Sequence, residues 1–266
     1  FSKTPTSIYK PAPNLGIITL DYPEKMNAWG PAMEAEVRQL LLRCSDDPEI
    51  RVIVLTGAGR AFCAGADMAA LQAAVGRELA QAEVRAAPDG DFEQRYSYLL
   101  AIPKPIVCAI NGVAVGVGLV VSLYCDIRWA AQSAKLLPVF ARRGLPAEHG
   151  IAWILPRIIG LADAFEWLAT ARPMTAQEAL GIRAVTAVLP DDGFREEVIR
   201  RAQQLASESS PRALSIIKRQ LYRAQAQRLA QAVHDAEAEV PGCLASEDFN
   251  EGVRHFVEKR AARFTG

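Results

Sequence analysis

Two short apolar segments, AFCAGADM at residues 61–68 and INGVAVGVGLV at residues 110–120, have the features of an anion-binding site. Each follows a β-branched run that predicts a strand, breaks at small residues and can then start a helix. The backbone N–H groups of Ala66 and Val117 are therefore predicted to face one point. Unpaired N–H donors at helix N-termini favour negative charge. The pair predicts an oxyanion hole in an enzyme that stabilises an enolate.

A carboxyl group that could move a proton is Glu148, in the segment RRGLPAEHG at 142–150. Its neighbours along the chain are mostly apolar, and such surroundings suit a carboxyl group to proton transfer near neutral pH. The alternatives are an exposed loop acid or an ion-pair partner of Arg142 or Arg143, which are themselves interpreted as structural. The adjacent His149 is a candidate base, although orientation or packing is the commoner role for such a histidine.

Other motifs argue against nucleotide-phosphate and metal chemistry. The stretch TGAG at 56–59 follows a strand, but Phe62 stands where a dinucleotide fingerprint needs its third glycine. No C-x-x-C pair or His/Cys cluster predicts a metal site. The five cysteines are odd in number and scattered, which favours reduced thiols in the core. Asp67 is interpreted as a helix cap rather than a catalytic acid.

Composition is typical of a globular protein, and we expect a cytoplasmic one. Of the 266 residues 50% are hydrophobic and 23% charged, with 30 basic and 30 acidic side chains. This balance gives no electrostatic case for nucleic acid or a membrane surface as a partner. The apolar run 105–125 is long enough to span a bilayer, but Pro105 and Asn111-Gly112 divide it into strand, turn and helix. No secretory signal is predicted.

Strands and helices alternate over about 190 residues, which predicts an α/β fold, and a helical tail follows. Strands are expected at 14–23, 49–59, 104–110, 126–131, 134–140 and 184–190, and helices at 31–44, 116–124, 149–160, 162–171, 194–206, 211–240 and 246–264. Thr175 and Glu178 form a capping-box pattern, and Ser246 is a predicted N-cap. We expect a core at 1–193 and a helical region at 194–266 that packs on the body or on a neighbouring subunit.

Four segments resemble, in order, motifs of the crotonase (enoyl-CoA hydratase/isomerase) superfamily. They are YPEKMNAW (22–29), VIVLTGAGRAFCAGADM (52–68), PKPIVCAINGVAVGVGL (103–119) and EGVRHFVEKRAARF (251–264). The resemblance covers essentially the whole chain. It implies a crotonase-like spiral of ββα units whose C-terminal helices build homotrimers or dimers of trimers.

The resemblance also implies an acyl-CoA substrate whose thioester oxygen is held by the amides of Ala66 and Val117. It implies CoA contacts at Lys25, Ala28, Ala64, Asp67 and Met68, with Phe256 and Lys259 near the nucleotide end, from a neighbouring subunit. No cofactor other than the coenzyme A of the substrate is expected. Metal, nucleic acid and membrane are not expected as partners.

Two departures from the family pattern narrow the chemistry. The two glutamates with which family hydratases add water correspond here to Val120 and Phe140, and neither carries a proton. Glu148 stands where dienoyl-CoA isomerases and chlorobenzoyl-CoA dehalogenase place an essential aspartate. The residues therefore favour double-bond isomerisation by a single acid, with hydration through one activated water still open. The alternatives are a non-catalytic acyl-CoA binding protein and a CoA-thioester hydrolase.

Val117 replaces the middle glycine of the usual G-G-G. A β-branched residue keeps the N–H donor, and we expect it to narrow the pocket and restrict φ.

Overall fold

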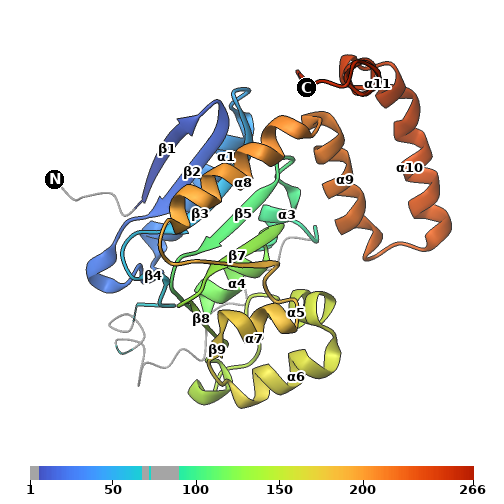
Figure 1. The fold of residues 1–266 in the computed structure, drawn as a ribbon. Coiled ribbons are helices and arrows are strands. Elements are labelled where there is room, and N and C mark those ends of the chain that lie inside the picture. The colour runs from blue at the N-terminus through green and yellow to red at the C-terminus, as the bar shows by residue number, and fades with distance from the viewer. Residues whose placement is uncertain (1–5, 68–71, 73–89) are drawn as a thin grey trace.

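The computed structural model describes residues 6–67, 72 and 90–266 (Figure 1). Its larger sheet contains, in spatial order, β1 (Thr6–Ala12), β2 (Asn14–Leu20), β3 (Ile50–Gly57), β5 (Ile106–Ile110), β7 (Ile127–Ala131) and β10 (Ala187–Leu189). β1 is antiparallel to β2, and the other neighbours are parallel. Parallel strands covered on both faces need nearly continuous apolar sequence, which is why β3 and β5 could be predicted.

The smaller sheet contains β4 (Ala61–Cys63), β6 (Val113–Val115), β8 (Lys135–Leu137) and β9 (Met174–Thr175). β4, β6 and β8 are parallel, and β9 is antiparallel to β8. Successive strand pairs β3–β4, β5–β6 and β7–β8 each give one strand to each sheet, which makes the spiral that the resemblance implies. β1, β4, β6 and β9 were not predicted, and three of them are too short to show a strand period.

Helices surround the two sheets (Figure 1). The described helices are η1 (Pro23–Lys25), α1 (Pro31–Asp46), α3 (Tyr98–Ala101), α4 (Val117–Leu123), η2 (Ala141–Arg143), α5 (Ile151–Ile159), α6 (Leu161–Thr170), α7 (Ala176–Gly181), α8 (Phe194–Glu208), α9 (Pro211–Ala224), α10 (Leu229–Leu244) and α11 (Glu247–Glu258). Gly16 of β2 faces Cys44 of α1, and the next residue, Ile17, lines a cavity with Val198 of α8. Because side chains alternate along a strand, α1 and α8 cover opposite faces of the larger sheet.

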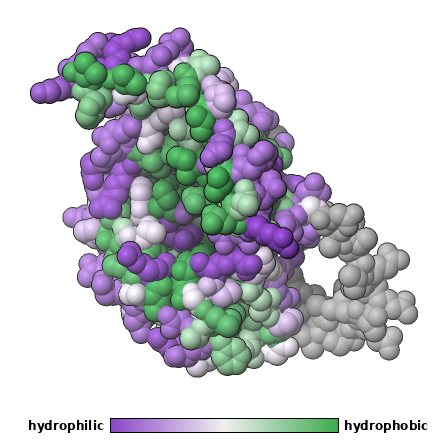
Figure 2. Space-filling view, turned by 90° about the vertical axis from the view of Figure 1, so that its right-hand side faces the viewer, coloured by the Kyte–Doolittle hydropathy of each residue, from purple (hydrophilic) through white to green (hydrophobic). Residues whose placement is uncertain are grey.

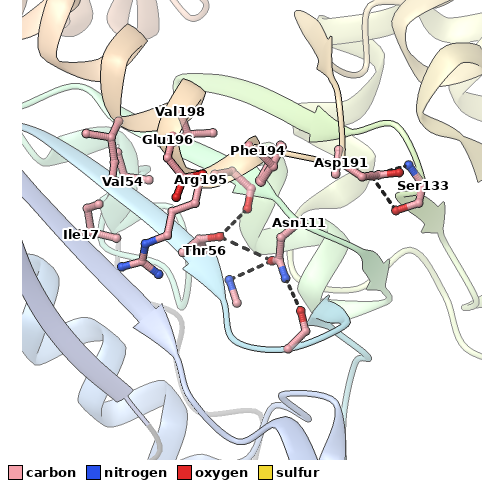
Figure 3. Close-up of a pocket in the computed structure, with 16 residues that line it drawn as sticks. Ile17, Val54, Thr56, Asn111, Ser133, Asp191, Phe194, Arg195, Glu196 and Val198 are labelled. Atoms are coloured by element: carbon pink, nitrogen blue, oxygen red, sulfur yellow. Dashed lines mark hydrogen bonds between the residues drawn. The ribbon is translucent and has the colours of Figure 1, made fainter.

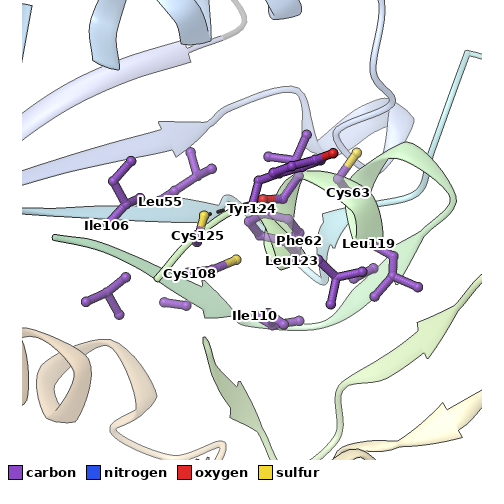
Figure 4. Packing of buried hydrophobic residues seen from close by; sticks show 14 of the residues in the cluster. Leu55, Phe62, Cys63, Ile106, Cys108, Ile110, Leu119, Leu123, Tyr124 and Cys125 are labelled. Carbon is purple, nitrogen blue, oxygen red and sulfur yellow. Dashed lines mark hydrogen bonds between the residues drawn. The ribbon is translucent and has the colours of Figure 1, made fainter. Parts of the chain in front are cut away.

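The apolar run 105–125 forms β5, β6 and α4 in the core, as the punctuation of the sequence predicts (Figure 4). Among the helices that the structure describes, none combines the length and apolar character needed to span a bilayer. All five cysteines are free, and four are buried. Burial raises the pKa of the Cys63 thiol to about 12, so this thiol is unreactive at neutral pH.

The expected helix 211–240 is wrong, because the chain forms two helices, α9 and α10, with a turn at 225–228. These four residues include no glycine or proline, so helix propensity gave no sign of the break. The turn lets α10 return alongside α9, where Arg219 pairs with Glu239 (Figure 1). Packing between the two helices therefore decides where α9 ends.

The predicted helix starts are confirmed. Thr175 and Glu178 form the complete capping box of α7, and the Ser246 hydroxyl accepts the N–H of Phe249 at the start of α11. α8 packs on β2 and β3, whereas α10 buries no residue against the body. The division of the chain at residue 193 stays a prediction.

Candidate functional site

Parallel pairing of β4 with β6 places the segments that carry Ala66 and Val117 side by side. Cys63 is paired with Ala114, and Ala66 and Val117 each lie three residues beyond their member of this pair. The two segments then touch: a Cβ at Gly118 would lie 2.6 Å from the Cys63 carbonyl oxygen, and one at Gly65 would lie 3.0 Å from the Val115 carbonyl oxygen. Glycine is required at both positions because the two backbones approach so closely.

Neither amide is used inside the described part of the chain. Val117 is the first residue of α4, where an N–H has no partner within the helix, and the Ala66 N–H donates to no described backbone group. The positive φ of 51° before α4 falls on Gly116. Val117 therefore replaces the usual glycine without backbone strain, and its side chain is buried at 7% exposure.

The segment that carries Ala66 is held by the segment at 25–29. The Trp29 N–H donates to the Gly65 carbonyl at 2.7 Å, and the Ala64 N–H donates to the Met26 carbonyl at 3.0 Å. Lys25 forms a salt bridge of 2.8 Å with Asp67. The structure thus brings together four of the predicted CoA contacts, Lys25, Ala28, Ala64 and Asp67. Met68 and the rest of the helix that Asp67 was predicted to cap lie outside the described residues.

Two asparagines hold the turn that leads from β3 to β4. The Asn27 side chain donates to the carbonyls of Ala58 and Ala61 at 2.9 and 2.8 Å. Asn111 accepts the Gly57 N–H at 3.0 Å and donates to the Gly59 carbonyl at 3.0 Å. The TGAG turn is therefore fixed by side chains and is not an open phosphate loop. Sequence analysis quoted both asparagines within motifs but assigned neither this role.

A cavity of about 360 Å³ lies between the larger sheet and the start of α8 (Figure 3). The Thr56 hydroxyl donates to the Ala109 carbonyl there, and the Ser133 hydroxyl donates to Asp191 at 2.8 Å. These polar groups are satisfied by each other, so we assign the cavity to the packing of α8.

The acid Glu148 lies half-buried in the loop before α5. The next residue, His149, has a φ of 60°, which is uncommon for a residue other than glycine, and its carbonyl accepts the Tyr124 hydroxyl at 3.0 Å. Burial lowers the pKa of His149, which favours the neutral imidazole. The Arg142 side chain donates to the Thr170 carbonyl at 3.3 Å, and its role as an ion-pair partner stays a prediction.

Aromatic rings connect the Ala66 segment with the Glu148 loop. The rings of Trp29 and Tyr96 make an edge contact at 6.0 Å, and those of Tyr96 and His149 make another at 5.3 Å. Glu34 of α1 lies beside these rings and forms a salt bridge with Arg95. We call Glu34, Arg95, Tyr96 and Trp29 the Glu34 cluster. Sequence analysis missed it, since residues 34 and 95 are far apart in the chain.

A second cavity, of about 440 Å³, opens beside His149. Its lining is largely aromatic and apolar and includes Phe92, Tyr96, Leu100, Tyr124 and Trp153. Tyr124 ends α4, whose first residue is Val117. Seven helical residues span roughly 10 Å, so α4 reaches from the proposed anion site to this cavity.

The remaining predicted positions divide into two groups. Val120 and Phe140 are buried apolar side chains, at 0% and 4% exposure. Phe256, on α11, is 79% exposed, and Lys259 ends the same helix. Figure 1 places α11 on the opposite side of the molecule from β4, so one chain alone does not bring these two residues to the site.

Within residues 6–67, 72 and 90–266, no three His, Cys, Asp or Glu side chains form a potential metal site.

Comparison with known proteins identifies the family of the chain. The family described as enoyl-CoA hydratase/isomerase matches residues 12–266. A "Probable enoyl-CoA hydratase" of Rhodobacter capsulatus is 37% identical and covers 97% of each chain. A "1,2-epoxyphenylacetyl-CoA isomerase" of Escherichia coli is 32% identical over 94% of each chain. The crystal structure of an enoyl-CoA hydratase from Bacillus anthracis superposes with a TM-score of 0.86 at 29% identity, covering 98% of this chain and 99% of that one.

Proposed function

Because the chain belongs to the enoyl-CoA hydratase/isomerase family, we propose that it converts acyl-CoA thioesters through an enolate. In this proposal the N–H groups of Ala66 and Val117 bind the thioester oxygen, and Glu148 is the single acid and base. The observation that carries it is that the Ala66 and Val117 N–H groups, each three residues beyond the paired Cys63 and Ala114, donate to no backbone group within the described residues.

The proposed reaction is a 1,3 proton shift. The Glu148 carboxylate removes a proton from an acyl carbon, and the electron pair moves toward the thioester, whose oxygen becomes the enolate oxygen. Two N–H donors stabilise this charge, and one such donor contributes on the order of 3–4 kcal/mol to the transition state. The protonated Glu148 then returns the proton to another carbon, so the double bond moves and no co-reactant is consumed.

Isomerisation is favoured over hydration because the apolar Val120 and Phe140 occupy the positions of the hydratase acids. With one acid, hydration requires Glu148 to activate the water and protonate the acyl carbon in turn. Relatives carry both names, hydratase and isomerase, so the family alone does not choose between them. The cavity beside His149 is the proposed acyl site, since it lies at the far end of α4 from Val117.

We further propose that the protein self-associates through its C-terminal helices as a trimer or a dimer of trimers. Large apolar side chains are exposed on these helices, including Leu221 (61%), Leu229 (81%), Leu244 (52%) and Phe256 (79%). Figure 2 shows apolar side chains at the surface on the side of the molecule that carries these helices. Exposed apolar surface is typical of subunit interfaces. Such an assembly would also provide Phe256 and Lys259 to the CoA of a neighbouring subunit. The expected result in light scattering is the mass of three or six chains; a monomer would contradict it.

The central test is Glu148→Gln, which keeps the shape of the side chain but removes its base. We expect turnover to fall by about 10²–10⁴-fold, the usual contribution of acid–base catalysis. Affinity for acyl-CoA, measured by calorimetry, should change less than twofold. Glu166→Gln, on the exposed face of α6, is the matched control and should leave turnover unchanged.

The substrates for this test are 2-enoyl, 3-enoyl, dienoyl and 3-hydroxyacyl thioesters of CoA, with products identified by mass. An isomer of unchanged mass supports the proposal, whereas free CoA with gain of water indicates a hydrolase. Turnover that survives Glu148→Gln would remove this residue from the mechanism. Tight binding without turnover of any substrate would indicate a non-catalytic binding protein.

A further inference from the structure

Glu34 accepts hydrogen bonds from three side chains on two segments: Trp29 on one, and the neighbouring Arg95 and Tyr96 on the other. Its Oε1 accepts Arg95 Nε at 2.7 Å, and its Oε2 accepts a second Arg95 nitrogen at 2.5 Å. The same Oε2 accepts the Tyr96 hydroxyl at 2.9 Å and Trp29 Nε1 at 3.2 Å. Hydrogen bonds to a charged group are about twice as strong as neutral ones. One carboxylate thus fixes the orientation of all three partners.

Two of these partners lead to opposite sides of the proposed site. The Trp29 carbonyl accepts the Asp67 N–H, and the Trp29 N–H donates to the Gly65 carbonyl. Gly65 and Asp67 are the two chain neighbours of Ala66. The Tyr96 ring, only 2% exposed, packs on His149, the neighbour of Glu148. The oxyanion segment and the acid loop are therefore each one side chain away from Glu34.

The pKa shifts of Glu34 and Arg95 support the same arrangement. Although partial burial opposes ionisation, the hydrogen bonds from Arg95, Tyr96 and Trp29 hold the pKa of Glu34 below its ordinary value. The pKa of Arg95 is raised, chiefly by its hydrogen bonds with Glu34 and in part by the charge of Glu148. Arg95 is therefore close enough to the proposed catalytic acid for their charges to interact.

We propose that Glu34 is a positioning residue that holds the Glu148–His149 loop in register with the Ala66 segment, through Tyr96 on one side and Trp29 on the other. It touches neither the thioester nor the reacting carbons. The proposal rests on the proposed function and adds a residue to it.

The test is Glu34→Gln, which retains shape and can still accept from Tyr96 and Trp29, but loses the charge that binds Arg95. We expect kcat to fall about tenfold with a KM for the acyl-CoA within twofold of wild type. The matched control is Glu197→Gln on α8, because Glu197 also pairs with arginine, Arg200 and Arg201, on the protein surface. This control should have the kcat of wild type.

A second readout follows the loop itself. The chain has three histidines, so the His149 imidazole can be titrated by NMR, with the exposed His234 as internal reference. Burial is the main cause that lowers the pKa of His149; the charge of Glu148 raises this pKa, that of Arg95 lowers it, and that of Glu34 raises it to a smaller extent. Release of the loop in Glu34→Gln therefore raises the His149 pKa toward its ordinary value. If Glu34→Gln removes the charge but the loop does not move, the pKa of His149 falls instead.

A tenfold loss of kcat together with a rise in the His149 pKa supports the proposal. An unchanged kcat overturns it, and so does a His149 pKa that falls or stays constant, because Glu34 then does not hold the loop. If the wild-type protein converts none of the thioesters, the proposed function fails, and the His149 titration still decides whether Glu34 holds the loop. Thermal melting of Glu34→Gln and Glu197→Gln shows whether both variants are folded.

Discussion

The Glu34 cluster and a second acid–base cluster use similar chemical groups for different purposes. We call Asp126, Lys218 and Tyr222 the Asp126 cluster. Asp126 accepts Lys218 Nζ at 2.8 Å, the Tyr222 hydroxyl at 2.9 Å and the backbone N–H of Ile106 at 2.7 Å. Like the Glu34 carboxylate, the Asp126 carboxylate accepts hydrogen bonds from one basic side chain and one tyrosine hydroxyl. The two clusters differ in what those partners connect.

The Asp126 cluster attaches α9 to the body. Lys218, at 6% exposure, also donates to the carbonyls of Leu99 and Lys104. Lys218 and Tyr222 are on α9, Leu99 is on α3 and Ile106 is on β5. The Glu34 cluster instead joins α1 to irregular segments on both sides of the proposed site, and the Glu34 and Arg95 side chains are 24% and 54% exposed. Similar groups therefore stabilise the fold where they are buried between elements, and position loops where they are partly open to solvent.

The largest effect that separates the two clusters is expected from Lys218→Met. Removing one partner of a buried ion pair leaves an uncompensated charge and typically costs about 3–5 kcal/mol. Urea denaturation should show this loss of unfolding free energy, because the Asp126 carboxylate keeps too few donors. The fraction that remains folded should have the kcat of wild type. A stability within about 1 kcal/mol of wild type would mean that Lys218 does not anchor α9.

A matched pair of smaller changes, Tyr222→Phe and Tyr96→Phe, sharpens the comparison. Each removes one hydroxyl that donates to a carboxylate and leaves the ring in place. For Tyr222→Phe we expect a loss of about 1.5–3 kcal/mol of unfolding free energy, the usual value for a hydrogen bond to a charged group, with unchanged kcat.

For Tyr96→Phe we expect the opposite: a small change in unfolding free energy and a larger loss of turnover. Glu34 is partly open to solvent and keeps both hydrogen bonds from Arg95, so stability should change by less than about 1 kcal/mol. Turnover should fall several-fold, because the ring is no longer tied to Glu34. Steady-state kinetics and urea denaturation of both variants check the contrast. Equal effects of the two substitutions on kcat would show that the clusters do not differ in function.

Much of the architecture follows from local sequence. The apolar runs of β3 and β5 predict buried parallel strands, and the helix of α1 follows from its periodic Met33, Val37 and Leu41. The capping box at Thr175 and Glu178 is confirmed atom for atom. These features depend on residues within a few positions of each other, which is the range over which sequence patterns carry structural information.

The candidate site was predictable where it uses backbone and unpredictable where it uses side-chain networks. Ala66 and Val117 could be proposed from the sequence because small residues after a strand mark a turn into a helix. The Asn27 and Asn111 contacts, and the hydrogen bonds of Arg95 and Tyr96 to Glu34, join residues 31 to 62 positions apart. Such pairs leave no periodic signal in a single sequence, because any number of carboxylates, amides and rings could pair at that range.

The amino-acid sequence determined the strand–helix order and the starts of α7 and α11, and it places the apolar Val120 and Phe140 where the resemblance leads us to expect the two hydratase acids. Tertiary structure alone decided where α9 ends, which carboxylates are shared between segments, and how His149 is held beside Tyr96. Local structure is set by neighbouring residues, whereas burial and side-chain pairing exist only once distant segments have packed together.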